Sequence, residues 1–195
     1  LVTGATGSGK STTLYAALNE LNHPDKKIIT AEDPVEYRLP RINQVQVHTK
    51  IGMDFAQILR AALRQDPDII LIGEMRDQVT AEIGMRAAMT GHLVLSTLHT
   101  NDAMHTLERL LDMGSEGYLI ASVLRAIVAQ RLLRRVCVSC KQVVELDEQQ
   151  RSWLNIAANG KYGDQEFYKG NGCTQCNSTG YHGRIGIYEM IEPDK

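Results

Sequence analysis

A glycine-rich segment near the start of the chain constrains the fold more than any other feature. From Gly4 to Ser11 it reads Gly-Ala-Thr-Gly-Ser-Gly-Lys-Ser, which fits the phosphate-binding pattern G-x-x-x-x-G-K-[ST]. The strand-like residues Leu1–Thr3 come before it, and a helical pattern over Lys10–Leu21 comes after it. A strand, this loop and a helix in that order form the setting in which the pattern binds a nucleotide.

The residues of this loop suit contact with a nucleoside triphosphate. Glycines let successive backbone N–H groups turn toward an anion, and the start of the following helix adds further unpaired N–H groups. In such loops the lysine, here Lys10, reaches the β- and γ-phosphates, and the hydroxyl of the next residue, here Ser11, ligates Mg²⁺. We therefore predict that ATP and Mg²⁺ bind here. The predicted nucleotide-binding residues are Gly4, Thr6, Gly7, Ser8, Gly9, Lys10, Ser11 and Thr12.

Strand-like and helical patterns alternate along residues 1–136. The expected strands are Leu1–Thr3, Ile28–Ala31, Ile69–Ile72 and His92–Leu98, with a short strand or hairpin around Gln44–Val47. The expected helices are Lys10–Leu21, Met53–Gln65, Val79–Met89, Asp102–Met113 and Glu116–Leu133. Because strands that alternate with helices form parallel sheets covered on both faces, the sequence predicts an α/β fold.

Acidic residues and a histidine follow three of these strands. Glu32 and Glu36 come after the strand near residue 30, Glu74 after the strand near residue 70, and His99 after the strand near residue 95. Ligands of open parallel sheets collect at the carboxyl ends of the strands. Hydrolysis of ATP needs a carboxylate that orients the attacking water and a group that contacts the γ-phosphate. The residues alone leave Glu32, Glu36 and Glu74 open as the general base, and Glu74 is also expected to reach Mg²⁺ through a water.

Two histidines flank the last of these strands. His92 and His99 are seven residues apart, which is about 23 Å along an extended strand, so they cannot contact the same phosphate. His99 stands at the carboxyl end and is the predicted contact to the γ-phosphate. His92 is expected to serve a subunit contact or packing, and the other four histidines are expected to be ordinary.

Four cysteines change the character of the chain after residue 136. Cys137 with Cys140 and Cys173 with Cys176 form two C-x-x-C pairs that are 32 residues apart. Four thiolates at such spacing are typical of a closed, structural Zn²⁺ site. Disulfides are the alternative, and a cytosolic compartment disfavours them. We expect the segment between the pairs to fold around Trp153, to contain a helix over Glu148–Ile156, and to be followed by a hairpin over Tyr181–Tyr188.

The composition is that of an ordinary soluble globular protein. Hydrophobic residues make up 43% of the 195 residues, charged residues make up 23%, and the net charge is −2. A surface dedicated to nucleic acid would need a basic excess, so no nucleic-acid partner is expected. The longest strand-like apolar run, Ile69–Ile72, is far shorter than the about 20 residues that span a bilayer. We expect a cytosolic chain without a transmembrane segment. Because it begins inside a core strand, we also expect further sequence upstream.

Several motifs together resemble the ATPases that power type II secretion and type IV pilus assembly. They extend over essentially the whole chain. Besides the phosphate loop and the four cysteines, they are Glu32-Asp33-Pro34-Val35-Glu36, Asp66-Pro67-Asp68 with Gly73-Glu74-Met75-Arg76-Asp77, Thr90-Gly91-His92-Leu93, Thr97-Leu98-His99-Thr100, Ala129-Gln130-Arg131-Leu132, and Gly180-Tyr181-His182-Gly183-Arg184-Ile185-Gly186.

The resemblance implies a domain organisation and a set of partners. It implies a RecA-like ATPase domain over residues 1–136 and a zinc-binding C-terminal subdomain over residues 137–195. It also implies a homo-hexamer with ATP bound between this part and an N-terminal domain, and Glu36 as the favoured general base. The expected place is the cytoplasmic side of the inner membrane, next to a platform protein.

The function that the resemblance implies is a motor for type IV pilus assembly. Type II secretion is the alternative, and retraction is disfavoured because retraction ATPases generally lack the four cysteines. A DNA translocase and a nucleotide-binding regulator without turnover are the remaining alternatives. Arg131, Arg134 and Arg135, expected at the end of the helix Glu116–Leu133, suit either a contact with a neighbour or membrane, or a solvated helix end.

Overall fold

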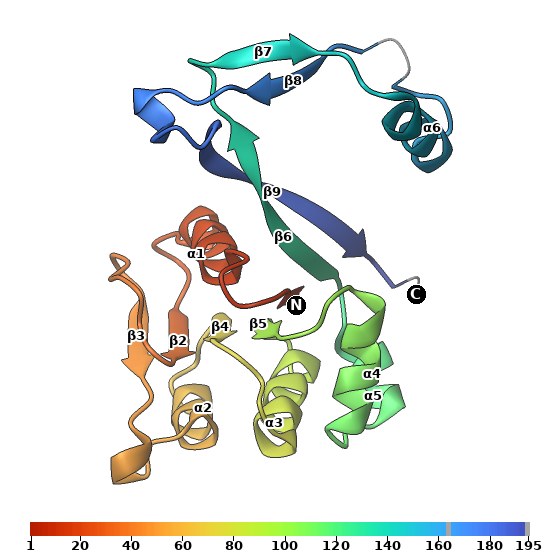
Figure 1. Ribbon diagram of the computed structural model, residues 1–195. Coiled ribbons are helices and arrows are strands. Elements are labelled where there is room, and N and C mark those ends of the chain that lie inside the picture. The colour runs from red at the N-terminus through yellow and green to blue at the C-terminus, as the bar shows by residue number, and fades with distance from the viewer. Residues whose placement is uncertain (163–164, 194–195) are drawn as a thin grey trace. The chain divides into compact units, whose positions relative to one another are not determined.

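The computed structural model describes residues 1–162 and 165–193 (Figure 1). They form two compact units. The first comprises Leu1–Arg131 together with the chain from Gly186 onward, and the second comprises Leu132–Ile185.

The first unit is built on a sheet of seven strands with the order β3-β2-β4-β5-β1-β6-β9. The strands are β1 (Val2–Thr3), β2 (Ile28–Glu32), β3 (Asn43–Gln46), β4 (Ile69–Ile72), β5 (Leu93–Leu98), β6 (Ile127–Val136) and β9 (Tyr181–Ile191). The helices are α1 (Lys10–Leu21), η1 (a 3₁₀ turn, Thr49–Ile51), α2 (Phe55–Leu63), α3 (Gln78–Met89), α4 (Met104–Asp112) and α5 (Gly117–Val123). β3, β2, β4, β5, β1 and β6 pair in parallel in that order.

Helices cover both faces of this sheet, so side chains on either face of its central strands are buried. In β4, Ile70 and Ile72 pack into a core with residues of α2, α3 and α5. Ile69 and Leu71 point the other way and pack with Leu18 and other residues of α1. Successive strand residues face opposite sides of a sheet, so a short, wholly apolar strand is the expected result. The predicted α/β fold with a mostly parallel sheet is confirmed.

The predicted helix Glu116–Leu133 is wrong in its second half. α5 ends at Val123, and Ile127–Val136 forms β6, which pairs with β1 so that Val128 lies opposite Val2. The Val128 N–H also donates to the Leu1 carbonyl at 2.9 Å. Intrinsic helix propensity is a weak preference that pairing along a buried strand readily overrides. The three arginines of this segment therefore lie on a strand and not at a helix end.

The short strand or hairpin predicted around Gln44–Val47 is a strand, β3, which pairs in parallel with β2. The hairpin predicted over Tyr181–Tyr188 is wrong, because Tyr181–Ile191 is one continuous strand, β9. The glycine before it, Gly180, has a φ of +76° and packs so closely on Gly170 that neither position has room for a side chain. Glycines here permit close approach of two backbones and do not mark the bend of a hairpin.

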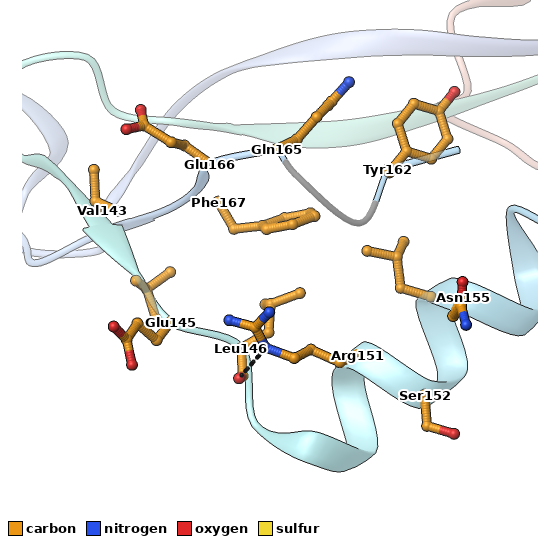
Figure 2. Close-up of a pocket in the computed structure, with 12 residues that line it drawn as sticks. Val143, Glu145, Leu146, Arg151, Ser152, Asn155, Tyr162, Gln165, Glu166 and Phe167 are labelled. Atoms are coloured by element: carbon orange, nitrogen blue, oxygen red, sulfur yellow. Dashed lines mark hydrogen bonds between the residues drawn. The ribbon is translucent and has the colours of Figure 1, made fainter. Parts of the chain in front are cut away.

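The second unit contains an antiparallel pair of strands, a helix and the cysteine cluster. β7 (Lys141–Val144) pairs with β8 (Phe167–Gly170), and η2 is a 3₁₀ turn over Thr174–Cys176. α6 (Glu148–Ala157) begins at a capping box made by Asp147 and Gln150. It agrees within one residue with the predicted helix Glu148–Ile156. A pocket of about 480 Å³ lies among β7, α6 and the residues leading into β8 (Figure 2).

The prediction that this unit folds around Trp153 is wrong. The Trp153 side chain is 69% exposed. Leu146, Leu154 and Phe167 line the pocket, and Arg151 donates to the Leu146 carbonyl at its edge (Figure 2). None of the residues lining this pocket is among the predicted nucleotide or zinc ligands. Of the helices in the described residues, none has both the length and the apolar character needed to cross a membrane.

Candidate functional site

The strand register brings four of the predicted site segments to one edge of the sheet. Thr3 lies opposite Leu98, Ile72 lies opposite Ser96, and Ala31 lies opposite Ile72. All these strands run in parallel, so the residues that follow them share the carboxyl edge. The phosphate loop, the Glu74 segment, the Glu32 segment and His99 therefore start from the same edge, where ligands of such sheets bind.

The phosphate loop is closed tightly around its own lysine. Lys10 is buried, and its ammonium donates to the carbonyls of Gly4 at 2.7 Å and Ala5 at 3.2 Å. Burial lowers the pKa of Lys10, and the nearby Glu74 carboxylate acts in the opposite direction. The Ser8 N–H closes the turn on the Ala5 carbonyl at 3.1 Å. Lys10 is thus held inside the loop as a cation that a phosphate oxygen can reach by replacing a carbonyl.

Two glycines of the loop show why the pattern needs glycine. Gly9 caps α1 with a φ of +89° and has no side chain to accept the first helix N–H groups, which leaves them for an anion. Gly4 has a φ of +145°, and a Cβ there would press on the Gln130 carbonyl oxygen and lie 2.7 Å from the Ser8 hydroxyl. The hydroxyl-bearing residues Ser11 and Thr12 are exposed at the start of α1.

Gln130 is a site-supporting residue that the sequence did not single out by itself. It is buried on β6, and its side-chain oxygen accepts a hydrogen bond from the Thr13 hydroxyl at 2.7 Å. Its carbonyl also limits the space at Gly4. Because β6 was expected to be helical, these contacts with the phosphate loop could not be anticipated.

Glu74 and His99 lie side by side at this edge of the sheet. One Glu74 carboxylate oxygen is 3.6 Å from His99 Nε2, and the other is paired with the Arg76 guanidinium. Arg76 also contacts the Asp33 carboxylate at 3.2 Å. The pKa of Arg76 is raised, first by its hydrogen bond to Glu74. Arg76 had no predicted role, yet it ties the Glu74 segment to the loop that carries Glu36.

The two glutamates of that loop have opposite environments. The Glu32 carboxylate is 4% exposed and accepts hydrogen bonds from Tyr15, Thr30 and the Gln44 amide. The Glu36 side chain is exposed, and its backbone N–H donates to the Tyr15 hydroxyl at 3.3 Å. A general base needs an oxygen that a water can reach. Glu36 offers one, whereas the oxygens of Glu32 are already taken.

His92 lies at the other edge of the sheet. It precedes β5, and its Nδ1 contacts the Ala87 carbonyl at 2.9 Å and the Thr90 hydroxyl at 3.1 Å. Asp68 lies at the same amino-terminal edge, where it accepts the Lys27 N–H at 2.8 Å. These contacts tie His92 to the end of α3 and keep it away from the phosphate loop.

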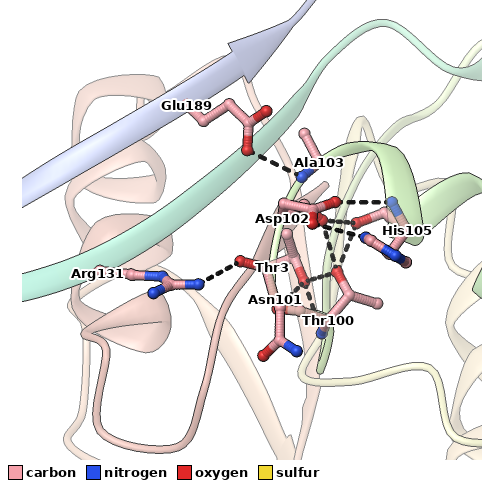
Figure 3. Close-up of polar contacts among 9 residues, drawn as sticks. Thr3, Thr100, Asn101, Asp102, Ala103, His105, Arg131 and Glu189 are labelled. Atoms are coloured by element: carbon pink, nitrogen blue, oxygen red, sulfur yellow. Dashed lines mark hydrogen bonds and ion pairs between the residues drawn. The ribbon is translucent and has the colours of Figure 1, made fainter. Parts of the chain in front are cut away.

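A chain of threonine hydroxyls joins the strand before the phosphate loop to the segment after His99 (Figure 3). The Thr3 hydroxyl is 2.6 Å from the Thr100 hydroxyl, which is 2.8 Å from that of Thr106. The Thr100 N–H also donates to Thr3 at 3.0 Å. At the start of α4, Asp102 accepts from the His105 N–H at 2.9 Å and lies 2.6 Å from the His105 ring nitrogen. His105, expected to be ordinary, thus helps to fix this helix.

The four cysteines come together in the second unit. All four sulfur atoms lie within 4.8 Å of one another, and the Cys137–Cys173 and Cys140–Cys176 separations are 3.9 and 3.8 Å. These separations are too long for disulfides, and tetrahedral Zn–S bonds of about 2.3 Å would place the sulfurs about 3.8 Å apart.

The backbone around the cluster favours a thiolate at Cys176. Burial raises the pKa of its thiol, but N–H groups of Cys173 and Gly180, at 3.2 and 3.3 Å from the sulfur, and hydrogen bonds from the thiols of Cys173 and Cys140 together lower the pKa to about 6. Metal ligands must be deprotonated, so the donor set fits a tetrahedral metal ion.

The sequence profile of the type II/IV secretion system proteins matches residues 1–195. The chain belongs to this family. It is 57% identical over 192 residues to the type IV pilus assembly ATPase PilB of Myxococcus xanthus, covering 98% of this chain and 34% of that protein. It is 51% identical over 195 residues to the type II secretion system protein E of Aeromonas hydrophila, covering 100% of this chain and 38% of that protein.

A solved structure of a related motor has the same fold as this chain. The crystal structure of the pilus retraction motor PilT with bound ADP matches it with a TM-score of 0.69 and 34% identity, covering 100% of this chain and 47% of PilT. The chain spans little more than a third of the length of the curated relatives that it matches.

Proposed function

We propose that this chain is the ATP-hydrolysing part of a motor that assembles type IV pili. The main support is the meeting of the phosphate loop, the Glu74–His99 pair and the loop carrying Glu36 at one edge of the sheet. The relative named as a pilus assembly ATPase, at 57% identity, favours the pilus cargo. The second candidate is type II secretion, which relatives at 51–53% identity favour.

Each residue has a part in the proposed reaction. Lys10 turns from the loop carbonyls to the β- and γ-phosphates, and His99 contacts the γ-phosphate. Glu36 orients a water for in-line attack and takes its proton, while Arg76 keeps the Glu74 carboxylate beside His99. The exposed Ser11 hydroxyl and Glu74, through a water, are oxygen donors of the kind that Mg²⁺ prefers. Mg²⁺ supplies positive charge that offsets the phosphate charge.

The cysteine cluster has a separate, structural part. We propose that Cys137, Cys140, Cys173 and Cys176 bind Zn²⁺ as four thiolates. Such a site has no open coordination position, so it stabilises the second unit and takes no part in hydrolysis.

The exposure of the site supports an assembly around it. Glu36, His99 and Arg76 are all exposed, and water must be excluded from such a site for electrostatic catalysis to be effective. A homo-hexamer in which a neighbouring copy or an N-terminal domain covers ATP would meet this need. We further propose that the hexamer works at the cytoplasmic side of the inner membrane, where it moves a platform protein.

The proposal is tested by turnover and ATP affinity of the full-length protein carrying Glu36→Gln or Glu74→Gln. We expect turnover to fall by about 10²–10⁴-fold with Glu36→Gln, the usual contribution of a general base, while ATP still binds. Glu20→Gln, on the exposed side of α1, is the control. Turnover that survives both changes would rule out the assigned site. A third outcome is also informative. If Glu36→Gln keeps its turnover while Lys10→Ala loses both ATP affinity and turnover, the nucleotide site is right and the general base is a different residue.

A second measurement separates the two cargoes. The gene is expressed in a host that lacks its pilus assembly ATPase and in one that lacks its secretion ATPase. Restored pili in the first host support the proposal, and restored secretion only in the second supports the alternative. An ATPase rate that rises on addition of DNA would instead favour a translocase.

A further inference from the structure

Glu32 is a buried carboxylate that the proposed reaction does not use. Its side chain is 4% exposed and accepts hydrogen bonds from two hydroxyls, those of Tyr15 and Thr30, and from the Gln44 amide at 3.1 Å. Burying an acidic group is costly unless hydrogen bonds replace its water, and three donors do so here. We therefore asked which other part of the site these buried hydrogen bonds hold in place.

The Tyr15 hydroxyl links Glu32 to the loop that carries Glu36. It donates to Glu32 and accepts from the Glu36 backbone N–H at 3.3 Å. A hydroxyl has one proton and two lone pairs, so it can serve both partners at once. Burial, and then the hydrogen bond to Glu32, raise the pKa of Tyr15, which keeps this proton on the hydroxyl.

Tyr15 also belongs to the helix that follows the phosphate loop. It lies on α1, which starts at Lys10, and its ring is buried in the core between α1 and the sheet. Lys10 and Ser11, the last residues of the phosphate-loop motif, thus lie on the same helix as Tyr15. A bond from Tyr15 to the Glu36 backbone therefore fixes Glu36 with respect to the phosphates that the loop would hold.

The Gln44 side chain forms hydrogen bonds with the same loop at two further backbone positions. Its amide nitrogen donates to the Tyr37 carbonyl at 3.1 Å, and its oxygen accepts from the Leu39 N–H at 2.7 Å. Gln44 comes from the edge strand β3, where it lies opposite Thr30 of β2, two residues before Glu32. Between them, Tyr15 and Gln44 hold three consecutive parts of the loop, at residues 36, 37 and 39.

We propose that Glu32, Tyr15 and Gln44 are positioning residues that hold the exposed Glu36 carboxylate at a fixed place relative to the phosphate loop. This inference rests on the proposed function, in which Glu36 is the base. Glu32 is then the anchor of the network and not an alternative base. An error of about 1 Å in the placement of a reacting group can lower turnover by about 100-fold, so such a network has a measurable effect.

The test uses Tyr15→Phe in the full-length protein, which removes the hydroxyl and keeps the ring. We expect kcat to fall about 10- to 100-fold, with the dissociation constant of ATP changed less than about twofold. Tyr118→Phe is the matched control, because Tyr118 is an exposed tyrosine at the start of α5, and it should leave kcat unchanged. A Tyr15→Phe protein with normal kcat would overturn the proposal.

A double mutant separates positioning from a general effect on the fold. In single-turnover measurements, Tyr15→Phe added to Glu36→Gln should cause no further loss, because the residue being positioned is already disabled. An equal further loss in that background would show that Tyr15 acts independently of Glu36, and the proposal would fail. If Glu36→Gln alone keeps its turnover, the proposed base is wrong whatever Tyr15 does.

Gln44→Met provides a second route if Tyr15→Phe does not fold. It releases the loop at Tyr37 and Leu39 and leaves Tyr15 in place. We expect kcat to fall with unchanged ATP affinity and a cooperative melting curve, with a lower midpoint because Glu32 loses one of its three donors. An unchanged kcat in a folded Gln44→Met protein would contradict the role of the network.

Discussion

Replacing Gly4 by alanine should disable the phosphate loop through a contact that the structure defines. The new Cβ would lie 2.7 Å from the Ser8 hydroxyl and closer still to the Gln130 carbonyl oxygen. Ordinary contacts begin at 3.4 Å, so the loop has to move about 0.7 Å from Ser8 and further from Gln130. Gln130 cannot yield, because β6 is paired with β1 at the adjacent residues Thr3 and Ala129. The loop itself must therefore shift.

The expected magnitude follows from this shift. A displacement near 1 Å at a reacting group costs up to about 100-fold, so kcat/KM for ATP should fall about 10- to 100-fold, which is about 1.4–2.7 kcal/mol of transition-state stabilisation. The φ of +145° adds a backbone strain of about 1–3 kcal/mol to the folded state. The melting temperature should therefore fall as well.

The assay compares Gly4→Ala with Gly52→Ala in steady-state ATPase and thermal unfolding measurements. Gly52 also has a positive φ, +78°, but a Cβ there would meet nothing within 4 Å. It should share the strain and lose stability without losing kcat/KM. A Gly4→Ala protein whose kcat/KM stays within about twofold of normal would refute the steric reasoning.

Three further predictions concern other parts of the molecule. The protein should contain one zinc per chain by elemental analysis, and chelation should expose residues 132–185 to proteases without abolishing ATP binding; a zinc-free protein with intact protease resistance would contradict this. The hydrogen bond to Asp102 raises the pKa of His105 above its usual 6.5, so the pair stabilises α4 fully below 6.5 and loses that effect as pH rises through the raised value; an NMR titration should show the raised midpoint, and Asp102→Asn should return it to normal. Thr3→Val removes the buried acceptor of the Thr100 N–H and should lower the free energy of unfolding by about 1–3 kcal/mol in urea titrations, whereas a loss below about 0.5 kcal/mol would mean that the hydroxyl chain relaxes.

The parts of the fold that the sequence predicted are those with strong local patterns. The short, wholly apolar run Ile69–Ile72 is typical of a strand buried on both faces, and the glycine-rich loop predicted a strand before it and a helix after it. The parallel sheet and the clustering of the four cysteines are confirmed on this basis. The roles of Lys10, Glu36, Glu74 and His99 in hydrolysis stay predictions that the mutants above will test.

The parts that the sequence mispredicted depend on distant residues. Ile127–Val136 has helix-forming residues, and only its pairing with β1, more than a hundred residues earlier, makes it a strand. Trp153 is exposed, whereas Leu146, Leu154 and Phe167 line the pocket of the second unit, and nothing in the local sequence separates these apolar residues. The residues alone could not rank Glu36 above Glu32, because the contacts of Tyr15 and Gln44 with the Glu32 carboxylate are visible only in the structure.

The path of the chain through β6 and β9 makes the second unit an insertion. The chain leaves the first unit after Arg131 and comes back to it at Gly186, and β6 and β9 are neighbours in the sheet. The first unit is thus made of two stretches of chain, and the cysteine module occupies the single continuous stretch between them. Removing that stretch would leave every residue of the phosphate loop and of β1 to β5 in the chain.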